Sequence, residues 1–274
     1  MNEVEKTLQI FRNLLNRHPH LAASFERLCS EAQGKTDENK ALDADWSEEE
    51  YILSHLPTVS AEFYVTHRKV REVEHQVGRF LNMRKIADEI MANDFAGDIV
   101  EFGTWQGLAL TILELCFRGD PTPRRLIGID SFEGLPETST VWDKGQFKNT
   151  SREIAERNIE RRISAGRSFT LIKGWFSDPE VAVKLKSICK SICLVHFDAD
   201  LASSTTDALR IIEPYLVERV QPMFFLFDDW GCHQDEVPEA FLAWLEYAKP
   251  KFGIRAEKLY TTNLTRYYRI SLKK

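Results

Sequence analysis

From residue 98 onward the sequence alternates short apolar runs with longer amphipathic segments, and this alternation constrains the fold more than any other feature. Each apolar run has the length of a strand, and each segment that follows is long enough for a helix. Repeated strand–helix units predict an α/β fold with a doubly wound, mostly parallel sheet. The predicted strands are Asp98–Phe102, Leu126–Asp130, Phe169–Lys173, Ile192–Asp198 and Met223–Asp228, and the predicted helices lie near 107–117, 151–165, 179–189, 203–217 and 236–249.

Two further β-rich runs lie at the C-terminal end. Glu257–Thr262 and Arg266–Leu272 are joined by the turn-forming residue Asn263. Two strands joined in this way form an antiparallel hairpin, which can complete the edge of a mostly parallel sheet. We therefore expect seven strands, of which the last two are antiparallel.

The N-terminal part has helical periodicity and no recognisable catalytic group. Residues 1–33 carry apolar side chains at helical spacing, a polar break follows at Gly34–Lys40, and Val65–Asn93 is a second helical stretch. We predict a helical N-terminal extension over residues 1–64 and the main domain over residues 65–274. Because its apolar helical faces need a partner surface, the extension is expected to serve assembly, such as a homo-oligomer, or to cover a pocket.

Composition excludes several classes of partner. A hydrophobic content of 43% over 274 residues is enough for a substantial core. The formal net charge of -6 and the lack of a basic block argue against nucleic acid. No apolar run approaches the roughly 20 residues of a membrane-spanning helix, and the polar start lacks a secretory signal. The five cysteines are odd in number and scattered, which suits a reducing compartment, so a cytoplasmic location is expected. Cys116 and Cys193 fall in apolar stretches and are expected to be small core residues.

The end of the first strand carries the first ligand-binding signal. Glu101 and Gly103 are followed by Gly107, in a Gly-x-x-x-Gly spacing that differs from the phosphate-binding Gly-x-Gly-x-x-Gly. Open α/β sheets bind ligands beyond the carboxyl ends of their strands. S-adenosylmethionine fits this turn, since the glycines permit a close backbone approach and Glu101 could sense its ammonium group. The glycines could also serve only to form a tight turn.

Two later strand ends support a nucleoside-like cofactor. Asp130 ends the second strand, where a carboxylate can accept hydrogen bonds from both ribose hydroxyls. Trp175 and Phe176 follow the third strand and offer an aromatic wall for adenine, although either ring could equally belong to the core.

Four aspartates are predicted to converge at the same edge of the sheet. Asp198 and Asp200 follow the fourth strand, and Asp228 and Asp229 follow the fifth. Carboxylates this close raise one another's pKa unless protons, basic groups or a cation compensate. Only His196 and His233 lie nearby in sequence, so a divalent cation such as Mg²⁺, bound through oxygens, is the economical solution. Alternatively, each aspartate could act as a helix cap or turn former.

Taken together, these motifs resemble the macrocin-type O-methyltransferase family over about residues 78–250. The resemblance lies in Asp98–Gly107, in the run from Ile129 to Pro136 that contains Ser-Phe-Glu-Gly-Leu-Pro, in Lys173–Asp178, in His196–Leu201 with Ser203–Thr205, and in Asp228-Asp229. It departs from the family at Ala202, where an aromatic or bulky residue is usual, and at Pro179, where threonine is common.

The resemblance implies a class I, Rossmann-like methyltransferase that moves a methyl group from S-adenosylmethionine to a hydroxyl, typically on a sugar of a secondary metabolite, with Mg²⁺ required. By position, the metal ligands would be Asp198, Asp228 and Asp229, and Asp200 would be the general base, with His196 as second choice. The residues assigned to the cofactor are Glu101, Gly103, Thr104, Gly107, Asp130, Ser131, Phe132, Gly174, Trp175 and Asp198.

Some assignments stay open at this level. A nicotinamide-dependent oxidoreductase is disfavoured by the glycine spacing and by the lack of a Tyr-x-x-x-Lys pair, and a non-catalytic scaffold protein is disfavoured by the intact carboxylates. The segment Glu137–Lys148 could fold over both ligands or be a surface loop. Trp230 and His233 could line an acceptor pocket, or Trp230 could pack in the core. The acceptor itself is not readable from the sequence.

Overall fold

The computed structural model describes residues 71–217, 221–230, 236–262 and 264–273, with side chains from Val77 onward. The predicted N-terminal extension, the domain boundary at residue 64, the turn at Asn263 and the position of His233 lie outside the described residues.

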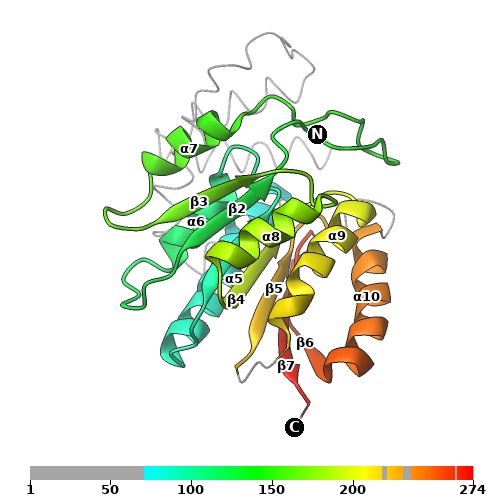
Figure 1. Cartoon of the computed structure of the whole chain (residues 1–274). Helices are drawn as coiled ribbons and strands as arrows, with labels where there is room; N and C mark the ends of the chain where they lie inside the picture. The colour runs from blue at the N-terminus through cyan, green and yellow to red at the C-terminus, as the bar shows by residue number, and fades with distance from the viewer. Residues whose placement is uncertain (1–70, 218–220, 231–235, 263, 274) are drawn as a thin grey trace, which may run out of the picture. The chain divides into compact units, whose positions relative to one another are not determined.

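The described chain forms one seven-stranded sheet (Figure 1). Its strands occur in the order β3-β2-β1-β4-β5-β7-β6. The first five strands pair in parallel, whereas β7 is antiparallel to both β5 and β6. Their bounds are β1 Asp98–Phe102, β2 Leu126–Asp130, β3 Phe169–Lys173, β4 Ile192–Phe197, β5 Met223–Phe227, β6 Ile254–Thr261 and β7 Arg266–Leu272.

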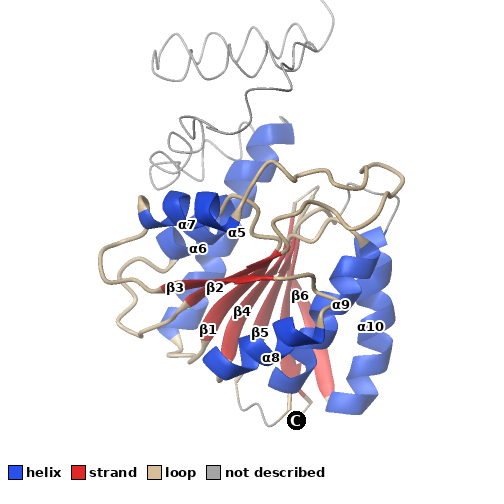
Figure 2. Ribbon diagram, turned by 45° about the horizontal axis from the view of Figure 1, so that its top comes forward, coloured by secondary structure: helices blue, strands red, loops and turns tan. Residues whose placement is uncertain are grey.

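Helices cover both faces of this sheet (Figure 2). One face carries α5 (Arg71–Ala92), α6 (Leu108–Cys116) and α7 (Arg152–Glu160), and the other carries α8 (Pro179–Ile188), α9 (Ala202–Ile212) and α10 (Glu236–Phe252). A short 3₁₀ turn, η2 (Glu213–Tyr215), extends α9. No described helix combines the length and the apolarity that crossing a membrane requires.

Burial on both faces of the sheet explains why the central strands are continuous apolar runs in the sequence. Every residue of β1, β4 and β5 is buried, since helices pack on both faces. Trp230 belongs to this core, because its ring packs against Phe227, Phe241 and Tyr268 at centroid distances of 5.4–5.8 Å. Cys116 and Cys193 are fully buried, as predicted.

The doubly wound, mostly parallel seven-stranded fold is confirmed, and the first five strands match their predicted bounds within one residue. The differences lie at element ends. Helix α9 stops at Ile212 because the next residues, Glu213–Tyr215 with Pro214 in the middle, form a 3₁₀ turn. Strand β6 begins at Ile254, three residues before the prediction, directly after the turn at Gly253 that follows α10.

Candidate active site

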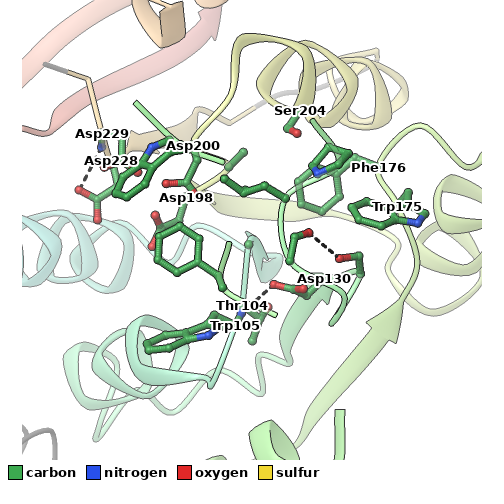
Figure 3. A pocket seen from close by; sticks show the side chains of 18 of the residues that line it. Thr104, Trp105, Asp130, Trp175, Phe176, Asp198, Asp200, Ser204, Asp228 and Asp229 are labelled. Atoms are coloured by element: carbon green, nitrogen blue, oxygen red, sulfur yellow. Dashed lines mark hydrogen bonds between the residues drawn. The ribbon is translucent and has the colours of Figure 1, made fainter. Parts of the chain in front are cut away.

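A cavity of about 610 Å³ opens at the carboxyl ends of the parallel strands, where the predicted site residues converge. Figure 3 shows Asp228 and Asp229 towards one end of this cavity and Trp175 towards the other, with Asp130 and Asp198 between them. Much of the lining comes from the ends of β1, β2, β3, β4 and β5 and the loops that follow them, and α5, α6 and α9 contribute the rest. The sheet therefore brings together groups that are far apart in the sequence.

The loops after four strands each contain a non-glycine residue with left-handed backbone geometry. The φ angles are 45° at Trp105, 55° at Phe132, 58° at Asp200 and 55° at Asp229. Such geometry costs free energy and persists where the surrounding structure enforces it, often at functional sites. In Asp200 and Asp229 it orients carboxylates that line the cavity.

Gly103 permits the close approach of the β1 and β4 ends. Its φ is +91°, and a Cβ atom there would lie 1.7 Å from the backbone oxygen of Asp198. Gly107 also has a positive φ, but a Cβ there would meet the side chain of Ile159 on α7. Gly103 thus shapes the cavity wall, whereas Gly107 serves the packing of α6 against α7.

Asp130 anchors the loops around the first half of the cavity. Its two carboxylate oxygens accept hydrogen bonds from the backbone amides of Trp105 (2.7 Å) and Phe132 (2.6 Å). Burial raises the pKa of Asp130 above its usual value, although these amide hydrogen bonds oppose the shift. Each oxygen has a further lone pair, so the carboxylate can also accept hydrogen bonds from the hydroxyl groups of a ligand.

Aromatic rings line the cavity on two sides. Trp175 and Phe176 both reach it from the loop after β3, and Phe176 also packs edge-on against the core residue Phe102 at 5.2 Å. From the loop after β2, Phe147 contacts both Trp105 and Trp142, at centroid distances of 6.1 and 5.2 Å.

The loop that carries Trp142 is tied to the opposite wall of the cavity. The side chain of Glu137 accepts a hydrogen bond from the Ser203 hydroxyl of α9. Thr140 donates to Glu236 at the start of α10, at 3.2 Å. Glu137, Trp142 and Phe147 of this segment line the cavity, and whether the segment folds over bound ligands stays a prediction.

The four aspartates converge at the other half of the cavity (Figure 3). Burial and the charges of Asp228 and Asp229 raise the pKa of Asp198 well above its usual range. Burial and the charges of Asp198 and Asp228 raise the pKa of Asp200 to about 8, against a hydrogen bond with Asp229. Such shifts mark a cluster of negative charge that is poorly solvated, and they are common at functional sites.

Two side chains complete this cluster: Arg79, which the sequence pattern did not place there, and His196, which the sequence placed nearby as a possible counter-charge and second-choice base. Arg79 of α5 donates from Nη1 to Oδ2 of Asp228 at 2.5 Å. His196 Nε2 lies 3.9 Å from that same oxygen, and its Nδ1 lies 3.0 Å from Oε1 of Glu101. Arg79 was missed because it precedes its partner by 149 residues and sits in a helix without a motif.

Part of the cluster has the geometry of a metal site. Ligand atoms of His196, Asp198 and Asp228 lie within 4.8 Å of one another. The backbone amide of Asp229 donates to Asp228 Oδ1 at 3.3 Å, and Asp229 lines the cavity beside this group. Two carboxylates and an imidazole suit a divalent cation that accepts oxygen and nitrogen ligands.

The predicted site residues divide into two groups. Those that line the cavity are Gly103, Thr104, Asp130, Ser131, Gly174, Trp175, Asp198, Asp200, Asp228 and Asp229. Glu101, Gly107, Phe132 and His196 are not among the lining residues, and they act on the site through neighbours. Glu101 in particular faces His196, because both side chains project from the same face of adjacent strands.

Comparison with known proteins shows that residues 73–251 match the macrocin-O-methyltransferase (TylF) family. Demethyldecarbamoylnovobiocin O-methyltransferase of Streptomyces niveus is 25% identical over 149 residues, which are 50% of this chain and 55% of that protein. An 8-demethyl-8-(2,3-dimethoxy-alpha-L-rhamnosyl)-tetracenomycin-C 4'-O-methyltransferase of Streptomyces olivaceus is 28% identical over 166 residues, 56% of this chain and 60% of that protein. The chain thus spans less than two thirds of the length of these relatives.

Solved structures with the same fold include the O-methyltransferase NovP, with a TM-score of 0.56 and 21% identity over 70% of this chain and 79% of that chain. The calicheamicin methyltransferase CalS11 has a TM-score of 0.52 and 22% identity over 86% of this chain and 98% of that chain. At this level of identity the likeness concerns the fold.

Proposed function

Because the chain belongs to the macrocin-O-methyltransferase (TylF) family, we propose that it transfers the methyl group of S-adenosylmethionine to a hydroxyl of a sugar or another polyhydroxylated small molecule, in secondary-metabolite biosynthesis. The observation that carries this proposal is the single cavity that joins the Asp130 half to the four-aspartate half. A methyl donor and a hydroxyl acceptor must meet in one water-poor space, and this cavity provides it.

The Asp130 half fits the cofactor. The Asp130 carboxylate has lone pairs for ribose hydroxyls, and the Trp175 ring offers a flat apolar surface for an adenine base. Gly103 keeps the adjoining backbone free of side-chain atoms. The cofactor contacts of Thr104, Ser131 and Gly174 belong to the same proposal, since all three line the cavity.

The aspartate half fits a divalent cation such as Mg²⁺. Asp198 and Asp228 would hold it, with Asp229 as the third carboxylate ligand and the His196 imidazole as an alternative donor. The buried charge of these carboxylates raises the pKa of Asp198, and a cation relieves that penalty. When bound, S-adenosylmethionine would supply an electrophilic methyl group, and the cation would supply positive charge beside the acceptor oxygen.

Asp200 is proposed to accept the proton of the acceptor hydroxyl. It lines the cavity, and its left-handed backbone turns its carboxylate towards Asp198 and Asp229. Burial and the neighbouring carboxylates raise its pKa to about 8, so without a cation it is mostly protonated at pH 7. A bound cation would lower this pKa and leave the carboxylate free to accept the proton. His196 is the alternative base, but both its ring nitrogens face carboxylates inside the protein.

The charge of the lining favours an acceptor without phosphate groups. Among the described lining residues, acidic side chains outnumber the basic ones, and the basic residue Arg79 is already paired with Asp228. Glu137 and Asp207 add negative charge beside Ser203 and Ser204. Polyhydroxylated or amino-bearing acceptors suit such a wall, since hydroxyl and ammonium groups can donate to carboxylates.

The experiment is a methyl-transfer assay with S-adenosylmethionine, Mg²⁺ and a panel of glycosides and free polyols, followed by mass spectrometry. We expect a mass gain of one methyl group on a sugar-bearing acceptor and none when excess chelator is present. Full activity in chelator would sink the metal dependence, and failure to bind S-adenosylhomocysteine by calorimetry would remove the cofactor.

A further inference from the structure

Arg79 makes a buried basic contact inside the aspartate cluster. Its side chain is 6% exposed, that of Asp228 is 2% exposed, and the Nη1–Oδ2 distance is 2.5 Å. An arginine guanidinium is not deprotonated in proteins, so this buried group carries a positive charge in direct contact with the proposed metal ligand Asp228.

The position of Arg79 on α5 is fixed by the fold. The flanking residues Phe80 and Met83 of the same helix are buried in the core. The hydroxyl of Tyr267, on β7, donates to the backbone oxygen of Arg79 at 3.4 Å. A charge held in this way cannot move into solvent without disturbing α5.

The Arg79 guanidinium and a divalent cation would compete for the same carboxylate, that of Asp228. The Oδ2 atom that Arg79 contacts is also the atom that faces His196 Nε2, in the group suited to a metal. Two positive groups on one carboxylate repel each other strongly where little water screens them. Without any positive group, however, the buried carboxylates would destabilise the fold.

We propose that Arg79 is a built-in counter-cation of the aspartate cluster, which stabilises the metal-free enzyme and lowers its affinity for Mg²⁺. The proposal rests on the proposed metal-dependent function. In this role, Arg79 balances the negative charge of the aspartate cluster whenever the cation has left the site. The protein therefore stays folded while Mg²⁺ exchanges. Removing the guanidinium shifts the cluster from a weak, exchangeable cation site to a tight one.

The test compares Arg79→Met with the wild type in Mg²⁺ titrations by calorimetry and in thermal unfolding with and without Mg²⁺. We expect the affinity for Mg²⁺ to rise by about tenfold or more, since a nearby positive charge is removed. We also expect the melting temperature to fall steeply in chelator and to recover in excess Mg²⁺.

Arg124→Met is the matched control. Arg124 also forms a buried ion pair, with Asp120 at 2.5 Å and both side chains 1% exposed, but it precedes β2 and lies outside the cavity lining. This variant should lose stability equally with and without Mg²⁺ and should keep the wild-type affinity for the cation.

Weaker Mg²⁺ binding in Arg79→Met, or an equal loss of stability in both conditions, would overturn the proposal. If Arg79→Met cannot be recovered even with Mg²⁺, Arg79→Lys decides: affinity equal to or tighter than that of the wild type supports a charge effect, and a loss of about tenfold or more overturns it. If calorimetry shows that the wild type binds no Mg²⁺, the proposed metal-dependent function is wrong. The unfolding data then measure only how much Arg79 stabilises the metal-free protein.

Discussion

The Nδ1 atom of His196 lies 3.0 Å from Oε1 of Glu101, and both side chains are only 1% exposed. The residues are register partners on β4 and β1, so their side chains project from the same face of the sheet. Burial alone would lower the pKa of His196, but the Glu101 hydrogen bond and the neighbouring carboxylates raise it. The second oxygen of Glu101 has no hydrogen-bond partner among the described residues. Within the described residues, the carboxylate of Glu101 therefore contacts the His196 ring and does not line the cavity.

Glu101→Gln is expected to lower the pKa of His196, because the variant removes the negative charge that stabilises the imidazolium. An NMR titration of the histidine ring protons in metal-free protein measures it. Glu114→Gln is the control, since Glu114 on α6 is equally buried but pairs with Arg118, two residues beyond the end of that helix. An unchanged His196 pKa together with a loss of S-adenosylhomocysteine binding would instead place Glu101 on the cofactor.

Asp130→Ala should weaken S-adenosylhomocysteine binding by about tenfold or more, because it removes ligand contacts and frees the amides of Trp105 and Phe132. Calorimetry measures the affinity. Glu133→Gln is the control, since Glu133 is exposed and lies outside the cavity lining. Equal affinities in wild type and Asp130→Ala would remove Asp130 from the cofactor site.

Substitutions among the four aspartates should differ in character. Asp228→Asn and Asp229→Asn should lose activity that excess Mg²⁺ partly restores, because an amide oxygen still coordinates without charge. Asp200→Asn should bind metal and cofactor yet lose turnover by roughly 10²–10⁴-fold, without rescue. Activity assays over a Mg²⁺ titration separate the two classes. Near-normal turnover of Asp200→Asn would make His196 the next base to test.

Trp142→Ala should weaken S-adenosylhomocysteine binding by about three- to tenfold, since an edge-on aromatic contact contributes about 0.5–1.5 kcal/mol. Trp142 lines the cavity through its contact with Phe147. The neighbouring Val141, which is 53% exposed and outside the lining, provides the control Val141→Ala. Identical dissociation rates for both variants in stopped-flow fluorescence would show that the loop does not retain the cofactor.

Acid stability should depend on Asp120. Burial alone would raise its pKa, but hydrogen bonds with Arg124 and the Thr122 amide lower it. A lowered folded-state pKa contributes stability above the unfolded value of about 3.9, and this contribution is lost as the pH falls through the folded value. Asp120→Asn should therefore lose about 3 kcal/mol at pH 7. In urea unfolding, the difference from the wild type should shrink below pH 4, and a constant difference would contradict the assignment.

The sequence predicted the fold well because strand length and burial are local properties. Runs such as Asp98–Phe102 are apolar wherever helices cover both faces, so their bounds are readable. The parallel strand order also brings the carboxyl ends of the strands to one edge of the sheet. Asp130 and the four clustered aspartates could therefore be predicted to lie at one site. Arg79 could not be found in this way, since its ion pair with Asp228 joins residues 149 positions apart and follows from no sequence spacing. The contact between Glu101 and His196 could not be predicted either, because sequence shows the position of a residue on a strand but not the neighbour that it faces.

The contacts of Arg79 also join segments that lie far apart along the chain. Among the described elements α5 comes first along the chain, Asp228 follows Arg79 by 149 residues, and Tyr267 lies in β7, the last described strand. Strand β7 inserts between β5 and β6, so β5 stays an open edge until that strand is complete. The contact that holds Arg79 beside the aspartate cluster can therefore form only in a chain that has been made at least as far as β7.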